Sequence, residues 1–164
     1  MNELSTAIRE KARELLESGQ VDCVIGYEAS AQDGARPVLV YASADTGRLV
    51  WNAHCVHNLV TYLHDKKKPP KRGEDPPRVA VVAKPCDSRA VNVLLAEQQI
   101  ERERVYVIGV ACEGMEDEEG KSQERCARCG DRVPVIYDVL IGDPPVVDTP
   151  SVSYADFAEI ESMS

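Results

Sequence analysis

The sequence predicts an α/β fold: a mainly parallel sheet with flanking helices, in a single domain. Two continuous apolar runs, residues 79–83 and 105–110, are typical of strands buried on both faces, and residues 88–98 between them have a helical pattern. A strand, a helix and a strand of these lengths make a βαβ unit with parallel strands and a right-handed crossover. The 164 residues suit one domain, and only 5% are aromatic, so the core must rest on aliphatic side chains.

An amphipathic helix is expected at the start of the chain, over residues 3–18. Apolar side chains recur there at intervals of three and four, and Gly19 follows as an end signal. The side chains on this face are Leu4, Ala7, Ile8, Ala12, Leu15 and Leu16.

The next segments predict two strands and a second helix. Apolar residues at 21–25 and 37–41 are separated by turn residues and predict strands. Residues 53–63 predict a helix with Asn52 as its N-cap, which places Cys55 in its first turns.

The remaining chain predicts a connector, a last strand and a tail. Residues 66–77 are polar and rich in proline, which is typical of a connector. Residues 135–141 predict the last strand. We therefore expect one α/β domain over residues 1–142 and a C-terminal tail over residues 143–164.

The charge of the chain excludes several classes of function. A formal net charge of −9 argues against nucleic-acid binding and against docking on anionic lipid, because both need a basic face. The start of the chain lacks the apolar core of a secretory signal, and no run approaches the roughly 20 apolar residues of a membrane span. We expect a cytoplasmic protein with no nucleic-acid or membrane partner.

Six cysteines are the most informative residues in a chain of this kind. Structural disulfides are uncommon in a reducing compartment, so metal binding or thiol chemistry is the better explanation. The six are Cys23, Cys55, Cys86, Cys112, Cys126 and Cys129.

Two of the cysteines occupy equivalent places in the predicted βαβ unit. Cys86 follows the first central strand and Cys112 follows the second, so parallel strands put both at the carboxyl edge of the sheet. Cys86 also precedes the helix expected from Ser88, whose N-terminus is predicted to lower the pKa of the thiol and to favour a thiolate ligand.

A CxxC pair completes a set of four thiols. Cys126 and Cys129 have the spacing with which two sulfurs hold one metal site, and with Cys86 and Cys112 they form the four-cysteine set that an iron–sulfur cubane requires. Three alternatives stay open on the pattern alone. Zinc uses the same ligands, the strand-end cysteines can be buried small hydrophobes, and the CxxC pair can belong to a thiol–disulfide oxidoreductase.

Several motifs, in order along the chain, resemble one known family. They are residues 49–52 through Cys55 to 58–59, then residues 83–90, 108–114, 126–129 and 137–142. The family is the iron–sulfur family related to the beta subunits of deazaflavin-dependent hydrogenases and dehydrogenases. Its members accompany heterodisulfide reductase-like and formate dehydrogenase-like complexes in anaerobes.

The resemblance implies a non-catalytic electron-transfer subunit of an oxidoreductase complex, with one [4Fe-4S] cluster. Pro85 stands where the family has glycine, and Ala111 stands where it has proline. Longer relatives continue into a ferredoxin domain with two more clusters. We therefore expect redox partner subunits, flavin or iron–sulfur proteins, to supply the missing carriers, with any flavin bound only in a partner.

The expected ligands are Cys86, Cys112, Cys126 and Cys129. Cys55 is a fifth candidate that can replace one of them, because its predicted helix start faces the same sheet edge. Cys23 lies within a predicted strand and is expected to be buried only.

Overall fold

The computed structural model describes residues 2–31, 34–66, 71 and 73–146. Its helices and strands follow one another in the order α1 (Glu3–Glu17), β1 (Cys23–Ala29), β2 (Ala35–Val40), η1 (Ser43–Arg48), η2 (Leu59–Tyr62), α2 (Leu63–Lys66), β3 (Val79–Ala83), α3 (Pro85–Ala96), η3 (Arg102–Arg104), β4 (Val105–Val110), α4 (Glu124–Ala127) and β5 (Val139–Ile141).

These strands form one five-stranded sheet in the order β2-β1-β3-β4-β5. The pairs β1–β3, β3–β4 and β4–β5 are parallel, and only the β1–β2 hairpin is antiparallel. The predicted α/β class with a mainly parallel sheet is therefore confirmed.

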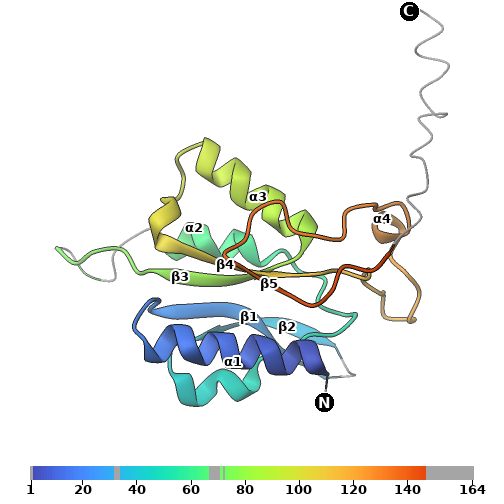
Figure 1. Cartoon of the computed structure of the whole chain (residues 1–164), viewed down its shortest axis with the longest axis horizontal. Helices are drawn as coiled ribbons and strands as arrows, with labels where there is room; N and C mark the ends of the chain where they lie inside the picture. Colours follow the sequence, from blue (N-terminus) through green and yellow to red (C-terminus); the bar gives the residue numbers. More distant parts are fainter. Residues whose placement is uncertain (1, 32–33, 67–70, 72, 147–164) are drawn as a thin grey trace, which may run out of the picture.

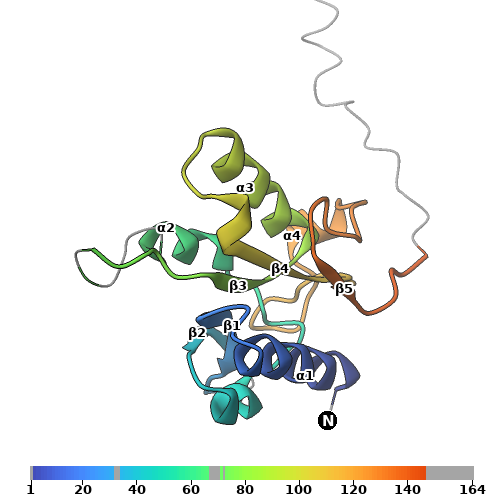
Figure 2. The same ribbon diagram turned by 60° about the vertical axis from the view of Figure 1, so that its left-hand side comes forward.

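Helices cover both faces of the sheet (Figures 1 and 2). Helix α1 lies on one face together with η1, and α3 lies on the other face together with η2 and α2. Asn2 accepts a hydrogen bond from the backbone N–H of Leu4 and so caps α1, and the helix buries Ile8, Ala12 and Leu15 against the sheet. The predicted amphipathic helix is confirmed.

The central strands form the core of the sheet. All five residues of β3 are buried, and β3 pairs in parallel with β4 over its whole length, from Val79 opposite Val105 to Ala83 opposite Gly109. Continuous burial on both faces is what the uninterrupted aliphatic runs predicted. Because α3 connects these adjacent strands, the predicted βαβ unit is confirmed, although α3 begins at Pro85 rather than near Ser88.

The predicted helix over residues 53–63 is wrong. Asn52 caps only a single turn, accepting a hydrogen bond from His54 N–H at its side chain and from Cys55 N–H at its carbonyl oxygen. A new short helical segment, η2, then begins after Asn58, whose side chain accepts from Val60 N–H. Cys55 therefore lies in a loop.

Other boundaries differ more modestly from the prediction. Strand β1 runs to Ala29 and not only over 21–25, and β2 begins at Ala35. The predicted last strand over 135–141 forms hydrogen bonds as a strand only from Val139 to Ile141.

A glycine in β4 lets the segment before β5 lie close to the sheet. A Cβ atom at Gly109 would lie 2.9 Å from Cβ of Tyr137 and 3.0 Å from Cγ of Pro134. The carboxylate of Asp138 also accepts from the N–H of Val107, at 2.7 Å. These contacts hold the chain that leads away from the CxxC pair against β4.

Most of the predicted tail, residues 147–164, lies outside the described residues, so the domain boundary after residue 142 stays a prediction. Within the described part of the chain, no helix has the length and apolar character needed to cross a membrane.

Candidate metal centre

Cys86 and Cys112 stand at matching positions beyond two adjacent parallel strands. Cys86 is three residues past Ala83, the end of β3, and Cys112 is three residues past its register partner Gly109. Cys86 lies in the first turn of α3, which begins at Pro85. The two thiols are therefore at the same carboxyl edge of the sheet, as predicted.

The CxxC pair reaches this edge from the loop between β4 and β5. Helix α4 contains Cys126, and the N–H of Cys129 donates to the carbonyl oxygen of Cys126 at 3.2 Å, which closes a tight turn. The loop is tied back to β4, because the N–H of Cys112 donates to the carbonyl oxygen of Arg132 at 3.0 Å. Figure 1 shows α4 at the same end of the sheet as the start of α3.

All four cysteines line one small cavity at this edge. Its volume is about 90 Å³, several times the space that one water needs. The lining residues are Lys84, Pro85, Cys86, Cys112, Gly114, Met115, Arg125, Cys126, Cys129, Asp131 and Arg132.

The side chains do not stand in a ligand geometry. In the part of the chain that the structure describes, no three His, Cys, Asp or Glu side chains are grouped as they would be around a metal ion. Sharing one cavity brings the four thiols to one place without fixing their coordination. The ligand assignment therefore stays a prediction.

The thiols at the two strand ends are in surroundings that favour the neutral form. Cys86 is exposed at the surface, yet partial desolvation raises the pKa of its thiol to about 11, and the neighbouring Asp87 carboxylate adds to the rise. Burial also raises the pKa of Cys112. The N–H of Gly114 donates to Sγ of Cys112 at 3.4 Å and lowers this pKa, but burial has the larger effect. The pKa of Cys86 is therefore raised, where the start of α3 was expected to lower it, and desolvation is the main cause.

Cationic side chains counter this effect around the cavity. Lys84 lowers the pKa of Cys86 and of Cys112, Arg125 lowers that of Cys86, and Arg132 lowers that of Cys112, although burial outweighs all of them. Among the described lining residues the one acidic side chain is Asp131, which is paired with Arg89, while Asp87 beside Cys86 is paired with Lys84. A group held by four thiolates is anionic, so this cationic wall fits it.

Lys84 is the most deeply buried of these cations. Its side chain is 1% exposed, and its Nζ contacts a carboxylate oxygen of Asp87 at 2.7 Å. It also donates to the hydroxyl of Tyr27 at 2.6 Å and to the carbonyl oxygen of His57 at 2.7 Å. The ammonium thus joins β1, the 52–58 loop and the first turn of α3 behind the cavity.

The other two cysteines lie apart from the cavity wall. Cys23 begins β1 and is 1% exposed, which confirms that it is buried. Cys55 is fully buried, and its Sγ accepts a hydrogen bond from the backbone N–H of Asn52 at 3.4 Å. Cys55 is not among the described residues that line the cavity, and its place as a fifth candidate ligand stays a prediction.

Sequence reasoning missed the cations of this cavity. Lys84 and Asp87, which flank Cys86 in the sequence, are both buried. Arg125 and Arg132 flank the CxxC pair on either side, and arginines gathered around cysteines in a chain of charge −9 were an available signal.

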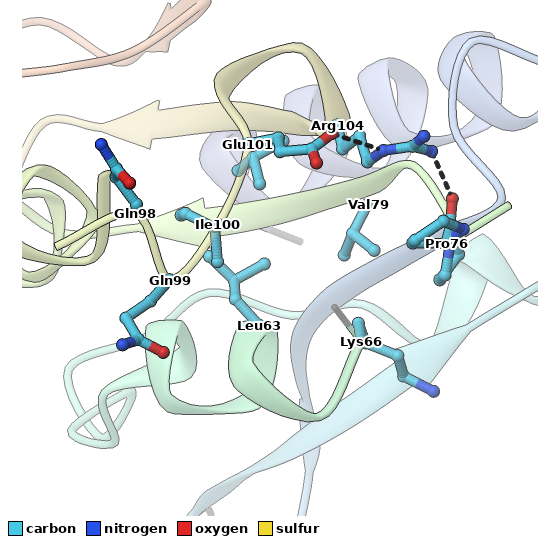
Figure 3. Close-up of a pocket in the computed structure, with 11 residues that line it drawn as sticks. Leu63, Lys66, Pro76, Val79, Gln98, Gln99, Ile100, Glu101 and Arg104 are labelled. Carbon is cyan, nitrogen blue, oxygen red and sulfur yellow. Dashed lines mark hydrogen bonds and ion pairs between the residues drawn. The ribbon is translucent and has the colours of Figure 1, made fainter. Parts of the chain in front are cut away.

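A second cavity lies at the opposite, amino edge of the sheet (Figure 3). It has a volume of about 300 Å³ and is lined by the first residues of two strands, Val79 and Val105, with Leu63 and Ile100 pointing toward its middle. Its arginine, Arg104, donates to Glu101 and to the carbonyl oxygen of Pro76. None of the described residues that line this cavity is a cysteine or a histidine.

Comparison with known proteins supports the resemblance seen in the motifs. The chain is 32% identical over 106 residues to the F420-dependent formate dehydrogenase 1 subunit beta of Methanococcus maripaludis, a match that covers 61% of this chain and 24% of that protein. No family model matches the chain.

A solved structure has a similar fold. It is a chain of the xenon-derivatised F420-reducing [NiFe] hydrogenase complex of Methanosarcina barkeri, with a TM-score of 0.55 and 19% identity over 69% of this chain and 39% of that one. At this identity the likeness shows the fold alone. The present chain spans less than half the length of either protein.

The predicted relationship is nevertheless confirmed. The formate dehydrogenase subunit is the beta subunit of an F420-dependent, that is deazaflavin-dependent, dehydrogenase, which is a kind of protein that the motifs indicated.

Proposed function

We propose that this chain carries one [4Fe-4S] cluster on Cys86, Cys112, Cys126 and Cys129 and transfers electrons within a deazaflavin-dependent oxidoreductase complex. The observation that carries the proposal is the single cavity that all four cysteines line at the carboxyl edge of the parallel sheet. Ligands bind at this edge in open α/β sheets. The relatives, named as parts of F420-dependent enzymes, supply the redox context.

When bound, the cluster would accept and release one electron at a time. The chain's own residues have three tasks in this reaction. The four thiolates hold the group, and Arg125 and Arg132 offset its negative charge, whereas Lys84 is already paired with Asp87. Met115 and Pro85 contribute apolar surface that keeps water from part of the cavity, which affects the reduction potential.

The proposal is tested by iron and sulfide analysis of protein purified without oxygen. A cluster gives about equal amounts of iron and acid-labile sulfide, together with a brown colour. Replacing any of the four cysteines with serine should lower the iron content, because a hydroxyl is a poorer ligand for this iron than a thiolate. Colourless protein with bound zinc would support a structural zinc module instead, and metal-free protein with an active CxxC pair would support a thiol–disulfide oxidoreductase.

Cys23 and Cys55 provide matched controls. Both are buried cysteines outside the cavity wall, so Cys23→Ser and Cys55→Ser should leave the iron-to-protein ratio of the folded protein unchanged. Loss of iron in Cys55→Ser, with iron retained in Cys126→Ser or Cys129→Ser, would contradict the assignment and put Cys55 in the ligand set.

We further propose that the chain works in the cytoplasm as a subunit or domain bound to flavin or iron–sulfur proteins. The two similar proteins support this, because one is a subunit of an F420-dependent dehydrogenase and the other is a chain of an F420-reducing hydrogenase complex. Anaerobic affinity purification from native cells should recover redox proteins with the tagged chain. A monomer recovered without any flavin or iron–sulfur protein would contradict the proposal.

A further inference from the structure

Arg132 contains an unusual buried donor. Among the residues that the structure describes, its Nε is the one buried side-chain nitrogen or oxygen atom without a hydrogen-bond partner. A buried donor that stays unpaired costs about 1–3 kcal/mol. Native proteins rarely contain such groups, so each one calls for an explanation such as a missing ligand.

The position of Arg132 indicates which ligand this donor serves. Arg132 lines the cavity of the four cysteines, and its backbone carbonyl accepts from Cys112 N–H at 3.0 Å. Its Nη1 in turn approaches the carbonyl oxygen of Cys112 at 3.5 Å. These two contacts fix the arginine beside one of the proposed ligands, and the guanidinium still has Nε–H to donate.

We propose that Arg132 is a positioning residue for the cluster, and that its Nε–H donates a hydrogen bond to a sulfur atom of the bound group. This inference rests on the proposed function and goes beyond it, because it assigns a role in setting the reduction potential to a residue that is not a ligand. Sulfur atoms held on iron are weakly basic acceptors, and N–H donors directed at them are a recognised means of tuning clusters.

The donor and its charge act in the same direction. Reduction by one electron from a partner subunit adds negative charge to the group. A hydrogen bond to sulfur and a nearby guanidinium both stabilise that charge, so Arg132 raises the reduction potential. In a cavity partly closed to water this effect is screened less than it would be at the surface.

Arg128 provides the matched control. It lies between the two cysteines of the CxxC pair, yet it is exposed, forms an ion pair with Glu124 at 2.9 Å and is not part of the cavity wall. Removing its charge changes the net charge of the chain by the same amount as removing that of Arg132.

The test compares Arg132→Met, Arg132→Lys and Arg128→Met in cluster-loaded protein, by anaerobic redox titration and by resonance Raman spectroscopy in H₂O and D₂O. We expect Arg132→Met to lower the midpoint potential, Arg132→Lys to restore only part of it, and Arg128→Met to match the parent. The deuterium shift of the Fe–S stretching bands should be smaller in both Arg132 variants. Arg132→Lys keeps the charge, and the backbone bond to Cys112 does not depend on the side chain, so this variant decides the question if Arg132→Met fails to load.

Two results would overturn the inference. In one, Arg132→Lys has the potential and the deuterium shift of the parent, which would remove the need for the Nε donor. In the other, Arg132→Met and Arg128→Met have equal potentials. A parent protein without iron and sulfide would instead overturn the proposed function, so the two failures are distinguishable.

Discussion

The ammonium of Lys84 and the carboxylate of Asp87 form an ion pair of 2.7 Å in the interior, with side chains that are 1% and 4% exposed. Asp87 is the third residue of α3, and its carboxylate also accepts from the backbone N–H of Lys84 at 3.3 Å. One carboxylate therefore caps the helix that contains Cys86 and neutralises the buried lysine. The pair links the proposed metal centre to the core.

We predict that Lys84→Met strongly destabilises the metal-free protein. The substitution leaves the Asp87 carboxylate buried without its partner, which typically costs about 3–5 kcal/mol. Urea unfolding measures the change in the free energy of unfolding. The double variant Lys84→Met/Asp87→Leu should recover much of the loss, because a buried pair replaced by apolar residues is often close to neutral.

The exposed pair of Lys121 and Glu119 provides the comparison. Both side chains are 73% exposed, so Lys121→Met should change the free energy of unfolding by less than about 1 kcal/mol. Equal effects of Lys84→Met and Lys121→Met would contradict a structural role for the buried pair.

The parts of the fold that depend on local pattern were predictable from the sequence. The strands β3 and β4 follow from continuous apolar runs, and α1 follows from apolar residues at helical spacing. The helix expected over 53–63 failed because two asparagines, Asn52 and Asn58, each cap a separate short turn with their side chains. Asparagine bonds to nearby backbone N–H groups and so competes with a continuous helix, which apolar spacing does not reveal.

Gly109→Ala is predicted to destabilise the protein and to loosen the segment before β5. The added Cβ would lie 2.9 Å from Cβ of Tyr137 and 3.0 Å from Cγ of Pro134, neither of which is the end of a flexible chain. Overpacking of this kind costs about 1–3 kcal/mol. Hydrogen exchange should show faster exchange at Asp138 N–H, which donates to Val107.

Gly47 provides the matched control for this substitution. A Cβ atom at Gly47 would meet nothing within 4 Å, so Gly47→Ala should change the free energy of unfolding by no more than about 0.5 kcal/mol. An equally small effect of Gly109→Ala would show that the segment at 134–137 shifts without cost.

Cys23 should make the stability of the metal-free protein fall at alkaline pH. Burial raises the pKa of its thiol from 9.0 to about 11. Between these values the unfolded thiol loses its proton while the folded thiol keeps it, so the unfolded state binds fewer protons and the free energy of unfolding falls as pH rises. A shift of this size corresponds to roughly 3 kcal/mol at most.

The measurement is urea unfolding of the parent and of Cys23→Val at pH 8 and above pH 10. Other groups titrate in the same range, so only the difference between the two proteins reports on Cys23. The variant should lose less stability than the parent as the pH rises. Parallel pH profiles would show that the Cys23 thiol reaches solvent in the folded protein.

The positions of the cysteines in the candidate site were predictable from the sequence, whereas the groups that surround them were not. The equivalent places of Cys86 and Cys112 follow from the βαβ pattern alone, because register carries them to one edge. The burial of Lys84 depends on the hydroxyl of Tyr27, which is 57 residues earlier in the chain. The raised pKa of Cys86 likewise depends on how neighbouring segments desolvate it, which no local pattern contains.

Gly114 provides the last prediction, because its backbone conformation and its contact with a thiol are linked. It has φ +114°, and its N–H donates to Sγ of Cys112 at 3.4 Å. Gly120 also has a positive φ, +76°, with nothing within 4 Å of an added Cβ. We expect Gly114→Ala and Gly120→Ala each to lower the free energy of unfolding by about 1–3 kcal/mol through backbone strain.

Only Gly114→Ala should also shorten the half-life of the brown chromophore in air, because it disturbs the N–H donor at a proposed ligand. The half-life is followed by visible absorption under conditions where both variants are fully folded. Equal half-lives for the two variants would show that the Gly114 turn contributes to stability alone.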